Sequence, residues 1–164
     1  AAMLGVLANS DGRADKVQTA VNLFLSQGAE LIIHCGDIGG RHVLDALAPA
    51  SSQGSVLFVW GDRDHDRTGL MRYGASLGIT CFGAIGELDY AQKKFIVLHG
   101  QDKAILRKLL AEQQYDYLLC GHSAQTTDQT VGHTRILNPG SVHGPGGSVM
   151  LLDPHSGKVR IIPI

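Results

Sequence analysis

Several features are absent from this 164-residue sequence, and their absence excludes some classes of protein. No apolar run comes near the roughly 20 residues that a membrane-spanning helix needs, and no charged segment followed by a long apolar one signals secretion. The formal net charge is only −1, so no strongly basic surface for nucleic acid and no polybasic stretch for an anionic membrane are expected. These absences favour a cytoplasmic protein that binds neither nucleic acid nor membranes, and they leave a homo-oligomer open.

Cysteine is also scarce, with Cys35, Cys81 and Cys120 widely spaced and no C-x-x-C pair. An odd number of isolated cysteines predicts reduced thiols rather than a disulfide framework or a cysteine-rich zinc site. No repeat, low-complexity tract or linker divides the chain. With 44% hydrophobic residues, we expect one globular domain over residues 1–164.

Short apolar runs alternate with amphipathic segments in the first half of the chain. The runs Met3–Ala8, Leu31–His34 and Val56–Trp60 predict buried strands, and helices are expected over Asp15–Ser26 and Arg41–Leu47, the second ending before Pro49. Because these strands are continuously apolar, they predict a parallel sheet covered on both faces.

The alternation of strands and helices becomes less regular in the second half of the chain. Helices are expected over Thr68–Leu77 and Lys103–Gln113, where the second has apolar residues on one side. Strands and antiparallel ribbons are expected over Thr80–Phe82, Glu87–Tyr90, Phe95–Leu98, Tyr117–Cys120, Thr130–Leu137 and Ser148–Ile164. The whole pattern predicts an α/β fold with mixed sheets.

Metal-type ligands follow the predicted strands, beside some of the 21 glycines: Asn9, Asp11, Asp37, Asp62, Asp64, His99 and His122. A single Gly-Asp pair more often marks a plain turn, but several strand ends carrying such residues favour a shared site. Carboxylates and imidazoles gathered there need a cation to offset their repulsion and desolvation. Mixed oxygen and nitrogen ligands suit Mn²⁺, Fe²⁺ or Zn²⁺ better than Ca²⁺.

The sequence resembles the calcineurin-like metallophosphoesterases, in particular the small single-domain bacterial and archaeal phosphodiesterases. That group has the motifs D-x-H, G-D, G-N-x-D, H-G, G-H-T-H and N-P-G-S in chain order. Their counterparts here are Asn9-Ser10-Asp11, Gly36-Asp37, Gly61-Asp62-Arg63-Asp64, His99-Gly100, Gly121-His122-Ser123-Ala124 and Asn138-Pro139-Gly140-Ser141. The resemblance implies a four-layer αββα sandwich of two mixed β-sheets flanked by helices, with a two-metal centre for phosphoester hydrolysis.

Two metal positions of unequal quality are implied by this resemblance. The first takes Asp37, Asp62, His99 and His122, with Asp62 where the family has Asn. The second takes Asn9, Asp11, the shared Asp37 and residue 124. This assignment aligns the family motif D-x-H with Asn9-Ser10-Asp11, so that Gly12 follows the motif. There Asn9 replaces Asp, Asp11 replaces His, and Ala124 has no ligand atom. We therefore expect one or two divalent ions per chain, with Mn²⁺ favoured and Zn²⁺, Fe²⁺ or Ni²⁺ as alternatives.

Other polar residues near these motifs are candidates for catalysis. Arg63 stands where some family members have a proton-donating His, and its guanidinium is suited to a phosphate. His65 is a candidate proton donor, and Asp64 is expected to orient a ligand. Arg13 is a further candidate for a phosphate contact. No spacing assigns a ligand role to His42, His133, His143 or His155, and His34 is expected to be a structural residue inside its strand.

Two functions follow from these residues. The first is a metal-dependent phosphoesterase, favoured as a phosphodiesterase, that acts on a small soluble substrate with a metal-activated water. The second is a weak or inactive relative that serves as a binding module or scaffold, as the phosphoesterase-like subunit of retromer does. The altered residues Asn9, Asp11 and Ala124 support the second reading, because a fold does not guarantee a function.

Overall fold

The computed structural model describes residues 2–164, which form four helices and eleven strands. In the first half lie β1 (Leu4–Leu7), α1 (Ala14–Ser26), β2 (Leu31–His34), α2 (Arg41–Ser51), β3 (Ser55–Phe58), α3 (Arg67–Ser76) and β4 (Ile79–Cys81). They are followed by β5 (Ile85–Tyr90), β6 (Lys93–Leu98), α4 (Lys103–Glu112), β7 (Tyr117–Leu119), β8 (Thr127–Val131), β9 (Thr134–Asn138), β10 (Ser148–Asp153) and β11 (Lys158–Pro163).

The strands form two mixed sheets. The first has the order β11-β10-β1-β2-β3-β4, in which β1 to β4 run parallel and β10 and β11 are antiparallel additions. The second has the order β5-β6-β7-β9-β8, with a parallel centre and antiparallel outer strands. The predicted parallel sheet and antiparallel ribbons are thereby confirmed.

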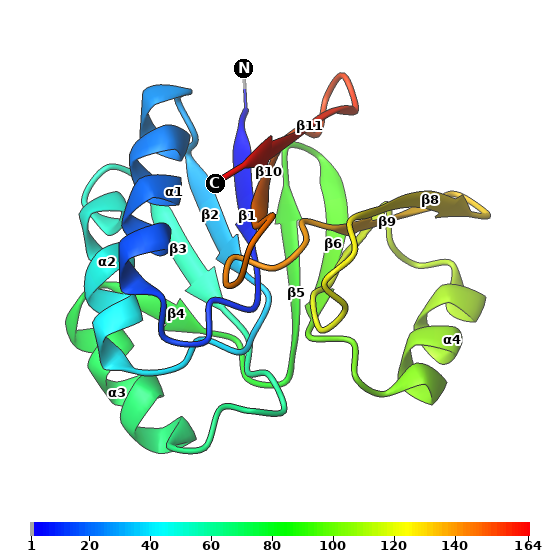
Figure 1. Ribbon diagram of the computed structural model, residues 1–164. Helices are drawn as coiled ribbons and strands as arrows, with labels where there is room; N and C mark the ends of the chain where they lie inside the picture. Colours follow the sequence, from blue (N-terminus) through cyan, green and yellow to red (C-terminus); the bar gives the residue numbers. More distant parts are fainter. Residues whose placement is uncertain (1) are drawn as a thin grey trace.

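Three apolar cores separate four layers. One core lies between the first sheet and helices α1 to α3, a second lies between the two sheets, and a third lies between the second sheet and α4. Figure 1 shows α1 to α3 on one side of the strands and α4 on the other. The expected αββα sandwich is therefore confirmed.

Helix α2 differs from its prediction, because it continues through Pro49 to Ser51 instead of ending before the proline. A proline removes one backbone hydrogen bond and strains the preceding turn. Here Pro49 is exposed, while Val43, Leu44, Leu47 and Ala50 form a buried stripe on the core. Packing of that stripe keeps the last turn helical in spite of the proline, since tertiary contacts supply most helical stability.

Among the helices of residues 2–164, none has both the length and the apolar character that crossing a bilayer requires.

Candidate metal centre

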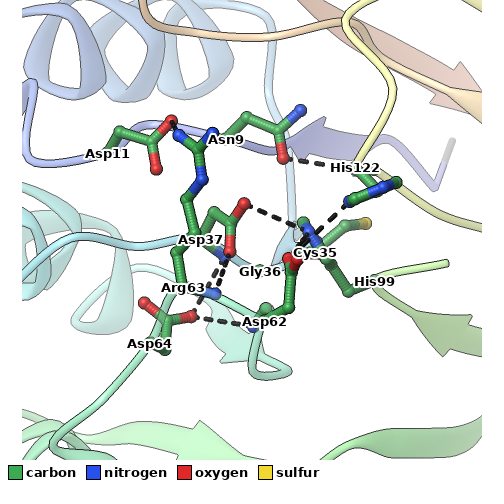
Figure 2. A network of polar contacts seen from close by, with 12 residues as sticks. Asn9, Asp11, Cys35, Gly36, Asp37, Asp62, Arg63, Asp64, His99 and His122 are labelled. Carbon is green, nitrogen blue, oxygen red and sulfur yellow. Dashed lines mark hydrogen bonds and ion pairs between the residues drawn. The ribbon is translucent and has the colours of Figure 1, made fainter. Parts of the chain in front are cut away.

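Residues from five strand ends converge at one edge of the sandwich (Figure 2). The loops after β1, β2, β3, β6 and β7 supply Asn9, Asp11, Asp37, Asp62, His99 and His122. Four of these residues have positive φ angles, namely 53° at Asn9, 43° at Asp11, 58° at Asp37 and 68° at His122. Residues other than glycine seldom adopt this backbone conformation, and it concentrates at functional sites.

His99 points an unsatisfied nitrogen between two carboxylates. Its Nδ1 lies 2.8 Å from the carbonyl oxygen of Cys35, which can only accept, so Nδ1 carries a proton. Its Nε2 lies 3.2 Å from Asp37 Oδ2 and 3.0 Å from Asp62 Oδ1. This buried atom has no hydrogen-bond partner among the described residues. A lone pair facing two carboxylate oxygens suits a metal cation, and the backbone contact to Nδ1 orients the ring as metal-bound histidines require.

His122 and Asp62 complete the ligand group. His122 Nδ1 lies 3.6 Å from Asp62 Oδ1, and its ring meets that of His99 edge-on with centroids 5.2 Å apart. One ligand atom each from Asp62, His99 and His122 lies within 4.8 Å of the others. Asp37 Oδ2 lies beside His99, so the four residues that the sequence predicts as one metal position lie close together.

The protonation of Asp37 and His99 reflects their mutual attraction. Burial pushes the pKa of Asp37 upward, but contacts with His99 and the Arg63 amide outweigh it, so the net pKa lies below the usual value. Burial pushes the pKa of His99 downward, but Asp37, the Cys35 carbonyl and Asp62 outweigh it and the net pKa is raised. Two carboxylates thus favour a positive charge at this point, which is what a bound cation supplies.

Asp64 joins the loops after β2 and β3. It is buried, and its two oxygens accept backbone N–H groups from Asp37, Ile38, Gly39 and Gly61 at 2.8–3.3 Å. A carboxylate that accepts this many backbone donors holds both loops in one geometry. Asp64 therefore positions Asp37 and does not itself face the ligand group.

Glycine is required where these loops touch. A Cβ atom on Gly61 would lie 2.0 Å from Asp37 Oδ1, and one on Gly36 would lie 2.7 Å from His99 Nδ1. Gly36 also has a φ of +102°, which L-amino acids with side chains rarely adopt. The glycines beside the predicted ligands therefore permit the close approach of two loops.

The side chain of Asn9 is held by protein groups. Its Oδ1 accepts the backbone N–H of His122 at 3.2 Å, and its Nδ2 donates to Ser141 Oγ at 2.9 Å and to the Ser123 carbonyl at 3.4 Å. Asn138 donates to the same Ser123 carbonyl at 3.2 Å. The segment 138–141 therefore braces the loop after β1.

Asp11 contacts two groups that bear or can bear positive charge. Its Oδ2 lies 3.0 Å from His143 Nε2 and 3.6 Å from Arg63 Nη1. Burial and Asp37 raise the pKa of Asp11, whereas His143 and Arg63 oppose that rise. His143 is the residue that the sequence reasoning missed. No spacing marks it, because its partner comes from the opposite end of the chain.

One cavity of about 260 Å³ is lined by residues of both predicted metal positions, namely Asn9, Asp11, Asp37, Asp62 and His122, and by Arg63 and His143. Ala124 also lines this cavity, and its methyl group offers no ligand atom. A larger hollow of about 710 Å³ lies along β5 and β6, where it is lined by Glu87, Asp89, Lys94 and Tyr115 among others. Since it contains none of the convergent ligands, the smaller cavity is the better candidate for chemistry.

His65 and Arg13 lie outside this cavity as the structure places them. His65 lines a neighbouring hollow with Gly39, Arg41 and Leu70, and Arg63 lines both this hollow and the cavity. Arg13 forms a two-point contact with exposed Asp15 at 2.9–3.0 Å. His34 is fully buried between Ser10 and the Gly36 amide, which confirms its structural role.

The two-sheet sandwich and the mixed carboxylate–histidine group define a class of metal-binding α/β proteins. The sequence model of the family described as the calcineurin-like phosphoesterase superfamily domain matches residues 3–157, and the chain belongs to this family. The resemblance noted in the sequence is thereby confirmed.

Individual relatives agree with this assignment. The chain is 22% identical to a phosphodiesterase of Methanocaldococcus jannaschii over 145 residues, which cover 86% of this chain and 84% of the relative. A solved archaeal phosphodiesterase superposes with a TM-score of 0.92 at 19% identity and 99% coverage of both chains. The E. coli phosphoesterase YfcE gives 0.69 at 18% identity and 99% coverage of both. Vps29 of Entamoeba histolytica, complexed with zinc, gives 0.63 at 18% identity, covering 99% of this chain and 98% of that one.

Proposed function

We propose that the protein is a metal-dependent phosphodiesterase that hydrolyses a small phosphodiester. The observation that carries the proposal is His99 Nε2, a buried atom without a hydrogen-bond partner among the described residues, which faces Asp37 and Asp62. A divalent ion held there supplies Lewis acidity and lowers the pKa of its bound water. Membership of the family and the similarity to archaeal phosphodiesterases support this chemistry.

The residues of the chain have distinct tasks in this proposal. Asp37, Asp62, His99 and His122 bind the ion, and Asp64 keeps Asp37 in place through its bonds to the surrounding backbone. Mn²⁺ is the favoured ion, with Zn²⁺, Fe²⁺ and Ni²⁺ as alternatives that accept mixed oxygen and nitrogen ligands. A role for His65 as proton donor stays a prediction.

The cysteines near the site do not act as nucleophiles in this proposal. Burial raises the pKa of the Cys120 thiol to about 11 and that of Cys35 well above its usual value. Both thiols are protonated near neutral pH, and the thiol form is unreactive. The three cysteines are unpaired in the described part of the chain, which agrees with the cytoplasmic location that we propose.

The test is hydrolysis of bis-p-nitrophenyl phosphate by dialysed protein with and without added Mn²⁺. Asp37→Ala and His122→Ala should abolish Mn²⁺-dependent hydrolysis. The exposed residues Asp89 and His155 provide matched controls, and Asp89→Ala and His155→Ala should retain it. Activity that survives both ligand substitutions, or that needs no metal, would rule the proposal out.

A binding module is the second candidate function, and a specific observation favours it. Asn9 and Asp11 contact other protein groups and Ala124 has no ligand atom, and the fold is shared with Vps29. Wild-type protein that binds no Mn²⁺ by elemental analysis and cleaves no phosphodiester would favour this function over catalysis.

A further inference from the structure

An arginine occupies the half of the cavity that lacks a full set of metal ligands. The backbone N–H of Arg63 donates to Asp37 Oδ1 at 3.0 Å, and its Nη1 lies 3.6 Å from Asp11 Oδ2. The side chain is 69% exposed. The guanidinium therefore starts from a backbone fixed to a metal-binding carboxylate and keeps most of its donors open to a ligand.

The groups that would hold a second ion in this half contact other protein groups. The Asn9 amide bonds to His122, Ser141 and Ser123. The Asp11 oxygen nearest to Arg63 also faces His143, and Ala124 contributes only a methyl group. A second ion would have to compete with the arginine charge for the same carboxylate, which is unfavourable at this short range.

Backbone contacts hold this arrangement in place. Asp11 N–H donates to the Asp37 carbonyl at 2.9 Å, and His143 N–H donates to the Asn9 carbonyl at 3.1 Å. Segments from three distant parts of the chain thus meet around one carboxylate beside the metal ligands. Figure 2 shows Arg63 reaching from the Asp37 side of the site toward Asp11.

Phosphodiester hydrolysis is accelerated by positive charge near both the attacking and the leaving oxygen, which two-metal enzymes supply with a pair of ions. A guanidinium is always charged, and its planar fork of donors matches two phosphate oxygens. An arginine next to a single ion can therefore supply the second positive centre.

We infer that Arg63 binds the substrate phosphoryl group in the place of a second metal ion, so that the chain uses one ion and one arginine. Asp11 and His143 then serve as the surroundings of Arg63 and not as metal ligands. This inference rests on the proposed phosphodiesterase function and assigns the group that contacts the phosphate.

The first experiment counts ions. Mn²⁺ is titrated into wild-type protein by calorimetry, and bound metal is measured after gel filtration. We expect one Mn²⁺ per chain at saturation, and still one in Asp11→Asn and His143→Gln. A second Mn²⁺ in wild-type protein contradicts the inference, and its loss in either variant would make that residue a metal ligand.

The second experiment titrates inorganic phosphate into the Mn²⁺-loaded protein. Arg63→Gln should weaken phosphate binding by about tenfold to a hundredfold, the usual effect of losing charge-assisted hydrogen bonds. Arg63→Lys should recover part of the affinity, because it restores the charge without the fork. Arg13→Gln is the matched control, since Arg13 also pairs with an aspartate but lies outside the cavity, and it should bind phosphate as wild-type does.

The outcomes separate the two proposals. Phosphate affinity that is equal in wild-type and Arg63→Gln, with both proteins equally folded by thermal unfolding, overturns the inference. Wild-type protein that binds no phosphate also overturns it. Phosphate binding that depends on Arg63 in a protein that cleaves no bis-p-nitrophenyl phosphate upholds this binding role and overturns the phosphodiesterase function alone.

Discussion

The two halves of the cavity are built from the same kind of strand-end loop but differ in how their polar groups are satisfied. In the half lined by Asp62 and His122, the neighbouring buried His99 has an Nε2 with no hydrogen-bond partner among the described residues, and this atom faces carboxylate oxygens. In the half around Asp11, protein groups meet the Asn9 amide and the Asp11 carboxylate. The comparison shows that ligand-type residues at similar strand ends can differ in whether the protein itself provides their hydrogen-bond partners.

The largest expected effect on hydrolysis comes from removing His99 Nε2, the buried nitrogen without a hydrogen-bond partner among the described residues. His99→Gln should lower Mn²⁺-dependent hydrolysis by about a thousandfold, the upper range for losing a group that stabilises transition-state charge. It should also remove the bound ion, as elemental analysis would show. In the other half, Asp11→Asn should retain the ion. Equal loss of metal in both variants would erase the difference between the halves.

A second prediction concerns His34, a buried histidine that differs from His99 in having a partner at both ring nitrogens. Both ring nitrogens of His34 have partners, Ser10 Oγ at 2.8 Å and the Gly36 N–H at 3.1 Å, and burial lowers the pKa of His34 to about 3. Because the unfolded chain binds this proton at a higher pH, stability from His34 is full above pH ~6.5 and falls as the pH drops toward 3.

The expected loss from this histidine is about 2.5 kcal/mol of unfolding free energy between pH 7 and pH 4.5, measured by urea unfolding with a chelator present. His34→Gln should show a smaller loss over the same interval, because it has no group that titrates there. Identical pH dependence in the two proteins would mean that His34 is not held neutral.

Asp64 provides the third prediction, since it braces the loops that carry Asp37 and Asp62 by accepting their backbone N–H groups. Asp64→Asn replaces one acceptor oxygen with a donor that faces backbone N–H groups, so unfolding free energy should fall by about 2 kcal/mol. Mn²⁺ affinity should fall by about tenfold to a hundredfold, as for other residues that orient metal ligands.

Asp66→Asn is the control for Asp64, because Asp66 caps α3 through Gly69 outside the cavity. It should leave the Mn²⁺ affinity unchanged. If calorimetry shows the same loss of Mn²⁺ affinity in both variants, Asp64 has no special positioning role.

The smallest effect is expected at Ala124. Ala124→His restores the family residue, yet we expect calorimetry to find one Mn²⁺ per chain, because Asn9 and Asp11 stay engaged with protein groups. The triple variant with Asn9→Asp and Asp11→His provides the comparison, and it should bind a second ion. A second ion in Ala124→His alone would show that only the missing imidazole separates the two halves.

Much of the fold could be predicted from local patterns. The continuously apolar runs at β1, β2 and β3 predicted a parallel sheet, and the Gly-flanked strand ends predicted where the ligands converge. Pro49 shows the limit of such rules. Its local signal ends a helix, but the buried stripe through Ala50 continues α2 to Ser51.

The sequence by itself determined which residues stand at the strand ends, because residue type and the spacing of apolar runs are local properties of the chain. Only the tertiary structure decided which of their atoms are satisfied. Asn9 meets Ser141 across 132 residues, and Asp11 meets His143 from a loop with no ligand signal. Such contacts depend on how two sheets and their loops pack. This packing leaves His99 Nε2 without a hydrogen-bond partner among the described residues, while protein groups contact Asn9 and Asp11.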